Sequence, residues 1–236
     1  MIAEKLNRPL AGRIAGLQTA PDLPDVAPPM SDGLIQAASA ALDRGETHYT
    51  DRGGIPALRA LVAAQYSSEL GRAIDQSTVT ITCGLIEARS VALRVLWQPG
   101  TAVICSQQIP EIRGIAHLLG APVIERWSAT QPIGIAYLTP ADSAEMVESV
   151  LATEPNYIVW DTSIPGTTPH PGKDPAVAPR IATVGSLDAV LPGWRVGWIV
   201  GSDMFEKLRG FKQALTICTT NISQWAAVEW LNTHHS

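Results

Sequence analysis

Short β-rich runs alternate with segments of helical periodicity along most of the chain, and this alternation limits the possible folds more than any other feature. Most neighbouring runs are separated by a helical crossover, which is the connection that parallel strands need. The pattern predicts a three-layer α/β fold, in which a mostly parallel sheet of about seven strands carries helices on both faces. The predicted strands are 79–82, 101–105, 123–126, 133–138, 157–160, 181–184 and 196–200.

The first part of the chain differs from the rest. Prolines at positions 9, 21, 24, 28 and 29 exclude a helix from the second half of residues 1–32, and we expect this segment to wrap a surface as an N-terminal arm. Ser31 then caps an amphipathic helix that ends near Leu42, and a second helix is expected over residues 55–70. Residues 33–236 are predicted to form one domain.

The composition excludes several classes of function. With 46% hydrophobic and 17% charged residues, the 236-residue chain can bury a sizeable core. A net charge of −5 without any basic run offers nucleic acid or an anionic membrane no electrostatic basis for binding. We expect no signal peptide and no membrane span, and the three cysteines without metal-type spacing favour a reducing cytoplasm. The sequence leaves open whether His234 and His235 are native.

Candidate binding residues lie in the loops after the predicted strands, because ligands of open α/β sheets bind beyond the carboxyl ends of the strands. After strand 79–82 the chain turns through Gly84 into a helix, and such a turn offers free amides and a positive helix end to an anion. The alternative is a strand-to-helix turn without a ligand. After strand 157–160 comes Asp161, which is either a binding residue or an ordinary turn residue.

Three stretches carry a resemblance to a known family: HYTDRGGIPALRAL at 48–61, GWRVGW at 193–198, and the longer segment 180–201. The chain resembles the class I/II aminotransferases of fold type I, which depend on pyridoxal phosphate (PLP), over nearly its whole length. The resemblance implies the large-domain fold of that family, a homodimer and a PLP site. The implied contacts are the amides of Gly84, Leu85 and Ile86 with Ser186 and Arg195 for the phosphate, Tyr49 for the phosphate of the neighbouring subunit, and Asp161 for the pyridine nitrogen.

The sequence departs from the family at the residue that catalysis needs most. The family carries Ser-x-Ser-Lys before a Gly-x-Arg, and the lysine holds PLP covalently, whereas this chain has Ser-Leu-Asp-Ala at 186–189. Counting forward from Ser186 puts Ala189 at the lysine position, and counting back from Arg195 puts Leu187 there. Neither register supplies a lysine. We therefore expect no covalently bound PLP, and whether PLP binds at all stays open.

Three other loop positions lack groups that the family uses. Ile109 stands where an aromatic ring usually stacks on the pyridine, and an aliphatic side chain has no π-face. Asp142 stands where an Asn would donate to the cofactor, which an ionised carboxylate cannot do; with Ser143 it could instead cap the next helix. Ile164 stands in the place of a Tyr. These changes all remove polar or aromatic contacts to PLP.

The four lysines of the sequence are Lys5, Lys173, Lys207 and Lys212. Lys5 lies in the arm, and we expect Lys207 and Lys212 on a polar helix face. Lys173, in a Pro/Gly/His-rich loop, is the only substitute for the missing lysine, although a surface position is expected for it as well. His170, between two prolines, is expected in solvent.

These observations lead to one hypothesis and two alternatives. We expect an aminotransferase-like protein that lacks the Schiff-base lysine and the family's C-terminal small domain, has no transaminase activity, and acts by binding. Its partner would be a second copy of the chain or a full-length aminotransferase paralogue. The alternatives are a PLP-related enzyme that uses Lys173, or Asp161, Asp142 and Arg195, and a protein that binds a phosphorylated small molecule through Arg195 and the Gly84 turn.

Overall fold

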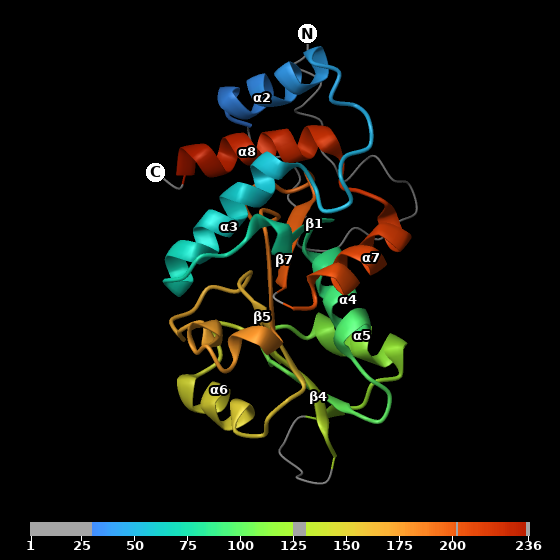
Figure 1. The fold of residues 1–236 in the computed structure, drawn as a ribbon, viewed down its shortest axis with the longest axis vertical. Coiled ribbons are helices and arrows are strands. Elements are labelled where there is room, and N and C mark those ends of the chain that lie inside the picture. Colours follow the sequence, from blue (N-terminus) through green and yellow to red (C-terminus); the bar gives the residue numbers. More distant parts are fainter. Residues whose placement is uncertain (1–29, 125–130, 202, 235–236) are drawn as a thin grey trace, which may run out of the picture.

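The computed structural model describes residues 30–124, 131–201 and 203–234, which form an α/β fold (Figure 1). The helices are α2 (Asp32–Asp43), α3 (Pro56–Leu70), α4 (Leu85–Leu96), α5 (Glu111–Leu119), α6 (Ala144–Leu151), α7 (Phe205–Thr216) and α8 (Asn221–His234). The strands are β1 (Val79–Cys83), β2 (Ala102–Cys105), β3 (Val123–Ile124), β4 (Ile133–Leu138), β5 (Tyr157–Asp161), β6 (Ile181–Ser186) and β7 (Val196–Gly201).

All seven strands form one sheet in the order β1-β7-β6-β5-β4-β2-β3. Strand β7 runs antiparallel to both of its neighbours, and the remaining pairs are parallel. The prediction of a mostly parallel seven-stranded sheet is therefore confirmed. The reversal at β7 arises because loop 187–195 is too short for a crossover and joins β6 to β7 as a hairpin. This loop consequently lies at the end of the sheet where β1 and β6 finish.

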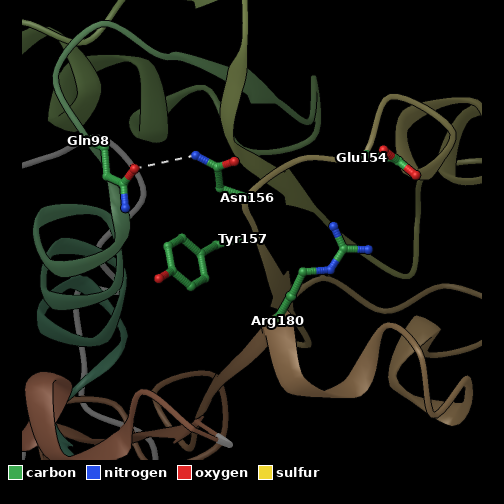
Figure 2. Close-up of a pocket in the computed structure, with 5 residues that line it drawn as sticks. All are labelled: Gln98, Glu154, Asn156, Tyr157 and Arg180. Atoms are coloured by element: carbon green, nitrogen blue, oxygen red, sulfur yellow. Dashed lines mark hydrogen bonds between the residues drawn. The ribbon is translucent and has the colours of Figure 1, made fainter.

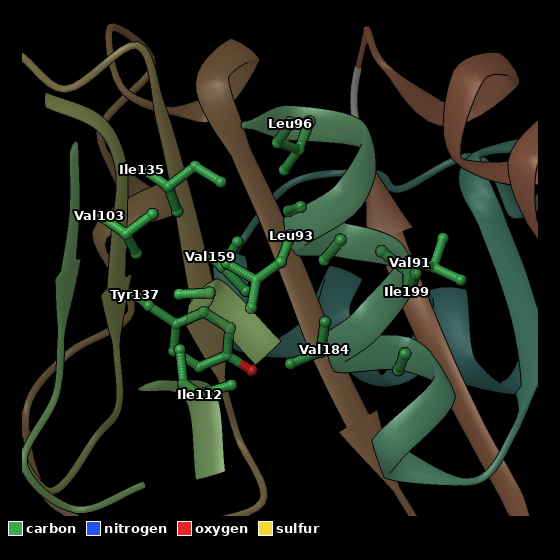
Figure 3. Close-up of a cluster of buried hydrophobic side chains, with 14 of the residues drawn as sticks. Val91, Leu93, Leu96, Val103, Ile112, Ile135, Tyr137, Val159, Val184 and Ile199 are labelled. Atoms are coloured by element: carbon green, nitrogen blue, oxygen red, sulfur yellow. The ribbon is translucent and has the colours of Figure 1, made fainter. Parts of the chain in front are cut away.

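Side chains that alternate along the strands point to opposite faces of the sheet and build a core on each. In β4, Ile135 and Tyr137 join the cluster beneath α4, α5 and α7, which Figure 3 shows. The intervening residues Ala136 and Leu138 join a cluster on the other face, with α6. On that same face α3 and α8 cover β1 and β7. The predicted three-layer arrangement, with helices on both faces, is confirmed.

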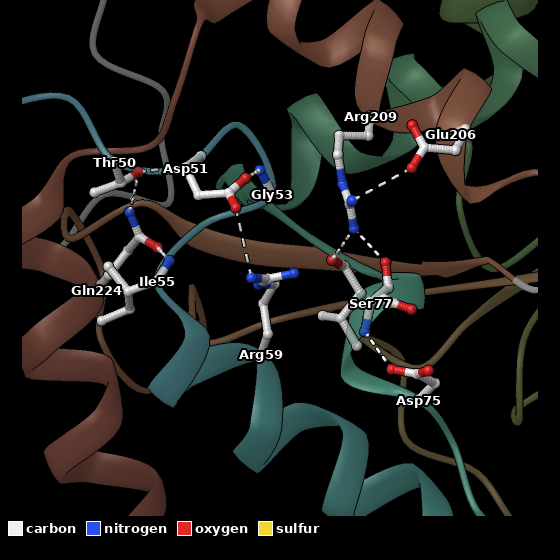
Figure 4. A network of polar contacts seen from close by, with 11 residues as sticks. Thr50, Asp51, Gly53, Ile55, Arg59, Asp75, Ser77, Glu206, Arg209 and Gln224 are labelled. Carbon is white, nitrogen blue, oxygen red and sulfur yellow. Dashed lines mark hydrogen bonds and ion pairs between the residues drawn. The ribbon is translucent and has the colours of Figure 1, made fainter.

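The run 48–61 holds segments that are distant in sequence together (Figure 4). The side chain of Gln224 in α8 accepts a hydrogen bond from the Ile55 N–H at 2.8 Å and donates one to the Thr219 carbonyl at 2.9 Å. Gly54 has a φ of 93°, and a Cβ there would lie 2.4 Å from Cγ1 of Ile81 in β1. Only glycine fits this position. The stretch that most resembles the family therefore docks a loop between β1 and α8.

Several predicted boundaries can be compared with the structure. Ser31 caps α2, as expected, by accepting the Leu34 N–H at 3.4 Å. Residues 1–29 of the predicted arm lie outside the described residues, as do Lys5, His235 and the last two positions of the predicted strand 123–126. All three cysteines are free. Within the described ranges, no helix has the length and apolar character needed to cross a bilayer.

Candidate functional site

The loop after β1 and the loop between β6 and β7 meet at the carboxyl end of the sheet. Gly84 follows β1 with a φ of 80°, and its backbone lies against Gly197 of β7. A Cβ on Gly197 would lie 2.7 Å from the carbonyl carbon of Gly84, so the two backbones can meet only because Gly197 has no side chain. This contact places the N-terminus of α4 beside loop 187–195.

The N-terminus of α4 receives its cap from that loop. The N-cap residue Gly84 has no side chain that could accept a hydrogen bond from the first amides of the helix. Asp188 Oδ2 accepts one instead from the Leu85 N–H at 2.9 Å, and another from Arg195 Nη1 at 2.7 Å. Ser186 Oγ accepts the Asp188 N–H at 3.2 Å. The structure thus brings Gly84, Leu85, Ser186 and Arg195 together, with an acid at the centre that sequence reasoning overlooked.

Arg195 is held firmly in this arrangement. Its Nη2 donates to the Cys83 carbonyl at 3.2 Å, and a Cβ on Gly84 would lie 2.4 Å from its Cζ. Arg195 has a φ of 56°, a left-handed conformation that costs a non-glycine residue free energy and persists only where surrounding contacts impose it. The guanidinium therefore lies directly over the Gly84 turn, paired with Asp188.

Asp161 ends β5 and is completely buried. Arg89 of α4 donates from Nε to Asp161 Oδ2 at 2.8 Å, forming an ion pair whose side chains are 5% and 0% exposed. The Tyr137 hydroxyl donates to the same oxygen at 2.8 Å, and the Ser163 N–H donates to Oδ1 at 2.9 Å. Burial raises the pKa of Tyr137 well above its ordinary value, so this hydroxyl stays a donor. Groups of the chain itself therefore occupy both oxygens of the Asp161 carboxylate.

Neither candidate position for the missing lysine carries a reactive group. Leu187 is buried and packs in the cluster with α3 and α8, while Ala189 is exposed. Lys173 and Lys207 are exposed, which confirms the surface positions expected for them. The structure thus offers no amine in the turn after β6.

The prediction for Lys212 is wrong, because this residue is fully buried beside Glu87 of α4. Burial lowers the pKa of the amine, and Nζ has no hydrogen-bond partner among the described residues. The nearby Glu87 carboxylate accepts from the Thr216 hydroxyl at 2.6 Å and from the Cys83 N–H. Lys212 follows Leu208 by four positions and therefore lies on the same buried face of α7. The prediction of a polar helix face did not take this spacing into account.

The other loop positions have structural roles. Ile109 is 1% exposed and Ile164 packs against the same cluster beneath α4 and α5. Asp142 is buried and accepts a hydrogen bond from the Ser106 hydroxyl at 2.8 Å and one from a backbone N–H of its own loop at 2.7 Å. Ser143 caps α6. The capping alternative is thus correct for Ser143, whereas Asp142 ties two loops together.

His170 does not lie in solvent, which overturns the expectation for it. It is buried, its Nδ1 accepts the Gly172 N–H at 2.9 Å, and its Nε2 lies 2.8 Å from the Thr183 hydroxyl. Burial, helped by the positive charges of Arg72 and Lys173, lowers the pKa of the ring to about 4. In the described part of the chain, no group of three or more His, Cys, Asp or Glu side chains could hold a metal ion.

The other two predicted phosphate contacts, Tyr49 and Ile86, have exposed side chains. Tyr49 is 80% exposed and borders an open hollow of about 470 Å³ between residues 46–49 and 218–222. A second hollow, of about 650 Å³, is lined by Gln98, Glu154, Asn156, Tyr157 and Arg180 (Figure 2). It lies where β5 begins, at the opposite end of the sheet from the ligand loops, so it is not the site that the fold predicts.

The sheet order and the loops at its carboxyl end define an α/β protein of the PLP-transferase large-domain type. No family model matches the chain. It is 27% identical to an aspartate aminotransferase of Rhizobium meliloti (strain 1021) over 84% of its length, and 28% identical to an arginine–pyruvate transaminase of Pseudomonas aeruginosa over 71%. The chain spans 57% and 51% of these two relatives.

Solved structures agree with these matches. The aspartate aminotransferase of Rhizobium meliloti has a TM-score of 0.74 at 23% identity, covering 90% of this chain and 62% of that one. YbdL of Escherichia coli, which has a methionine aminotransferase function, has a TM-score of 0.75 at 18% identity, covering 87% and 64%. In sequence and in fold, the chain is thus similar to the fold-type I aminotransferases.

PLP is the cofactor of this family, and the residues of this chain do not fit it. An acid, Asp188, stands at the helix end where the phosphate would bind, and like charges repel. The acid expected to face the ring nitrogen, Asp161, is enclosed and paired with Arg89. Loop 187–195, directly after β6, contains no lysine. Each of the three parts of a PLP site is thus missing or already occupied.

Proposed function

We propose that this chain is an aminotransferase-like protein that has no transaminase activity and acts by binding. The observation that carries the proposal is the Arg89–Asp161 ion pair, which is buried on both sides. A ring nitrogen could reach Asp161 only by displacing the guanidinium. Breaking a buried pair leaves an uncompensated charge at a cost of about 3–5 kcal/mol, which opposes such a displacement.

The absence of a suitable amine supports the same conclusion. Transamination needs a lysine that attaches the cofactor and moves a proton. Lys173 and Lys207 are exposed, so neither amine is desolvated in the way that an activated lysine nucleophile is. Lys212 is buried, but its Nζ is closed off from solvent and therefore from an aldehyde in solution.

The alternatives have less support. An enzyme that combines Asp142, Asp161 and Arg195 would need these groups to face one cleft. Asp142 and Asp161 are instead buried in separate hydrogen-bond networks. A protein that binds a phosphorylated small molecule through Arg195 would need a free guanidinium, and Arg195 is already paired with Asp188.

The binding partner proposed is a second copy of the chain or a full-length aminotransferase paralogue, in the cytoplasm. Tyr49 supports a partner on its face of the molecule, because an aromatic side chain that is 80% exposed gains stabilisation when another surface covers it. We further propose that residues 1–32 form an arm and that residues 33–236 correspond to the family's large domain.

The lack of transaminase chemistry can be tested by trapping. The purified protein is incubated with PLP or with pyridoxal, which lacks the phosphate, then reduced with borohydride and mapped by mass spectrometry. We expect no lysine to be modified more by PLP than by pyridoxal, and no saturable change in PLP absorbance. The aspartate aminotransferase of Rhizobium meliloti serves as the positive control. A one-to-one adduct on a single lysine, formed with PLP alone, would refute the proposal and favour the PLP-related enzyme.

The binding surface can be tested by sedimentation. We expect the wild-type chain to associate with itself or with a full-length paralogue, and Tyr49→Ala to weaken that association. Leu118→Ala is the matched control, since Leu118 is 77% exposed on α5. Equal effects of the two substitutions, or a wild-type chain that stays monomeric alone and with the paralogue, would contradict the proposed surface.

A further inference from the structure

We infer that Asp188 is a built-in substitute for phosphate: its carboxylate occupies the anion site at the N-terminus of α4 and closes that site to phosphorylated ligands. The inference rests on the proposed function, because a working cofactor site would have to be open. It adds the reason why the cofactor would not bind, which is that a residue of the chain itself fills the phosphate site.

The contacts of Asp188 are those that an anion makes at a helix end. Its Oδ2 accepts the Leu85 N–H, an amide that no residue within α4 can satisfy, and it pairs with the Arg195 guanidinium. The positive end of a helix and an arginine together favour a negative charge at this point. Ser186, from the end of β6, fixes the backbone of Asp188 through its hydroxyl. The anion site therefore persists in the fold, with a carboxylate from the chain in it.

A second, independent contact points the same way. Arg89, from the first half of α4, brings a positive charge to Asp161, where a protonated ring nitrogen would stand. Asp188, from loop 187–195, brings a negative charge to the place of a phosphate. The two residues come from different elements, and each supplies the sign of charge that the corresponding end of PLP would bring. The chain thus places a charge of its own at both ends of the site.

A tethered carboxylate has an advantage over a free anion. It is already close to its partners, so its effective concentration exceeds that of phosphate in solution. The surrounding backbone is committed to this arrangement: Arg195 has a φ of 56°, and Gly193 a φ of 87°. We therefore expect phosphate to leave the wild-type protein unaffected, and to bind once the carboxylate is removed.

The experiment measures the unfolding temperature while inorganic phosphate replaces chloride at constant ionic strength. We expect no phosphate-dependent rise for the wild type, and a saturable rise for Asp188→Ala that reflects binding to the folded state. The double variant Asp188→Ala/Arg195→Ala should lose the rise, because half of the site is gone. Asp43→Ala, at an exposed acid in α2, is the matched control and should behave like the wild type.

Phosphorus NMR then measures the same binding directly, as broadening of the phosphate signal by Asp188→Ala alone. An Asp188→Ala protein that folds only when phosphate is present would also support the inference. An equal rise for the wild type and Asp188→Ala, or no rise and no broadening for Asp188→Ala and for the isosteric Asp188→Asn, would overturn it. These results are separate from the trapping experiment, which reports on lysine chemistry in the wild type, so either idea can fail alone.

Discussion

The Arg89–Asp161 pair allows the sharpest prediction from this structure. Replacing Arg89 with methionine keeps a long side chain under α4 but removes the charge that balances Asp161. The carboxylate would keep only its hydrogen bonds from the Tyr137 hydroxyl and the Ser163 N–H, and both of these donors are uncharged. An unpaired charge would then remain in a position with no exposure to water.

The expected loss can be worked out from this burial. Removing one partner of a buried pair costs about 3–5 kcal/mol, and for a chain of this length each kcal/mol lowers the unfolding temperature by about 2–4 °C. Arg89→Met should therefore unfold about 6–20 °C below the wild type. Asp161→Asn should lose a similar amount, because it leaves the guanidinium buried alone. The double variant removes both charges and should be more stable than the sum of the two losses predicts.

The assay is urea unfolding followed by tryptophan fluorescence, combined with thermal unfolding. Arg94→Met, on the exposed side of the same helix, is the control and should change the free energy of unfolding by less than about 0.5 kcal/mol. If Arg89→Met costs no more than Arg94→Met, or if the single losses simply add in the double variant, Asp161 does not depend on Arg89. The proposal that this pair closes the site would then fail.

Three further predictions concern other buried groups. As the pH falls from 6.5 to 4, the wild type should lose about 3 kcal/mol of stability relative to His170→Asn, because over this range the unfolded chain binds a proton at His170 that the buried ring does not. Urea titrations at a series of pH values measure this loss. The same dependence of the free energy of unfolding on pH in both proteins would contradict it. Lys212→Met should raise the free energy of unfolding by about 1–3 kcal/mol, because it removes a buried amine that has no hydrogen-bond partner among the described residues, whereas the exposed Lys207→Met should not. A less stable Lys212→Met would show that the Glu87 carboxylate needs the charge of the amine. In thermal unfolding, Gly197→Ala should destabilise the fold, because its Cβ would meet the backbone of the loop after β1. Gly114→Ala, in open space on α5, should stabilise the fold by about 0.5–1 kcal/mol. A Gly197→Ala protein more stable than Gly114→Ala would refute the close contact.

The strands and helices were predictable because their signals are local. Alternating apolar runs mark the strands, and residues such as Ser31 mark helix starts with a side chain that satisfies free amides. The antiparallel direction of β7 was not foreseen as such, although the shortness of loop 187–195 implies it once the strands on either side are known to pair. Pairing is a long-range property, and a single sequence does not display it.

The polar residues were harder to place because burial depends on partners from other elements. Arg89, among the apolar residues of α4, carried a usable signal, because a charged side chain at a position that faces a core requires a buried partner. Lys212 gave a similar signal through its spacing from Leu208. His170 gave none, since the prolines beside it suggested a loop in solvent, and only the packing of that loop onto Thr183 buries it.

By itself, the sequence determined that this chain builds a mostly parallel α/β sheet and that loop 187–195, after the strand ending at Ser186, contains no lysine. Both facts depend on residue identity along short segments. Only the tertiary structure decided which groups of the chain now lie where the family contacts its cofactor. Asp188 reaches the end of α4, and Arg89 reaches Asp161, across separations of 103 and 72 residues. A charge as deeply buried as Asp161 must be paired to be stable, and the fold alone determines which partners are near enough to do so.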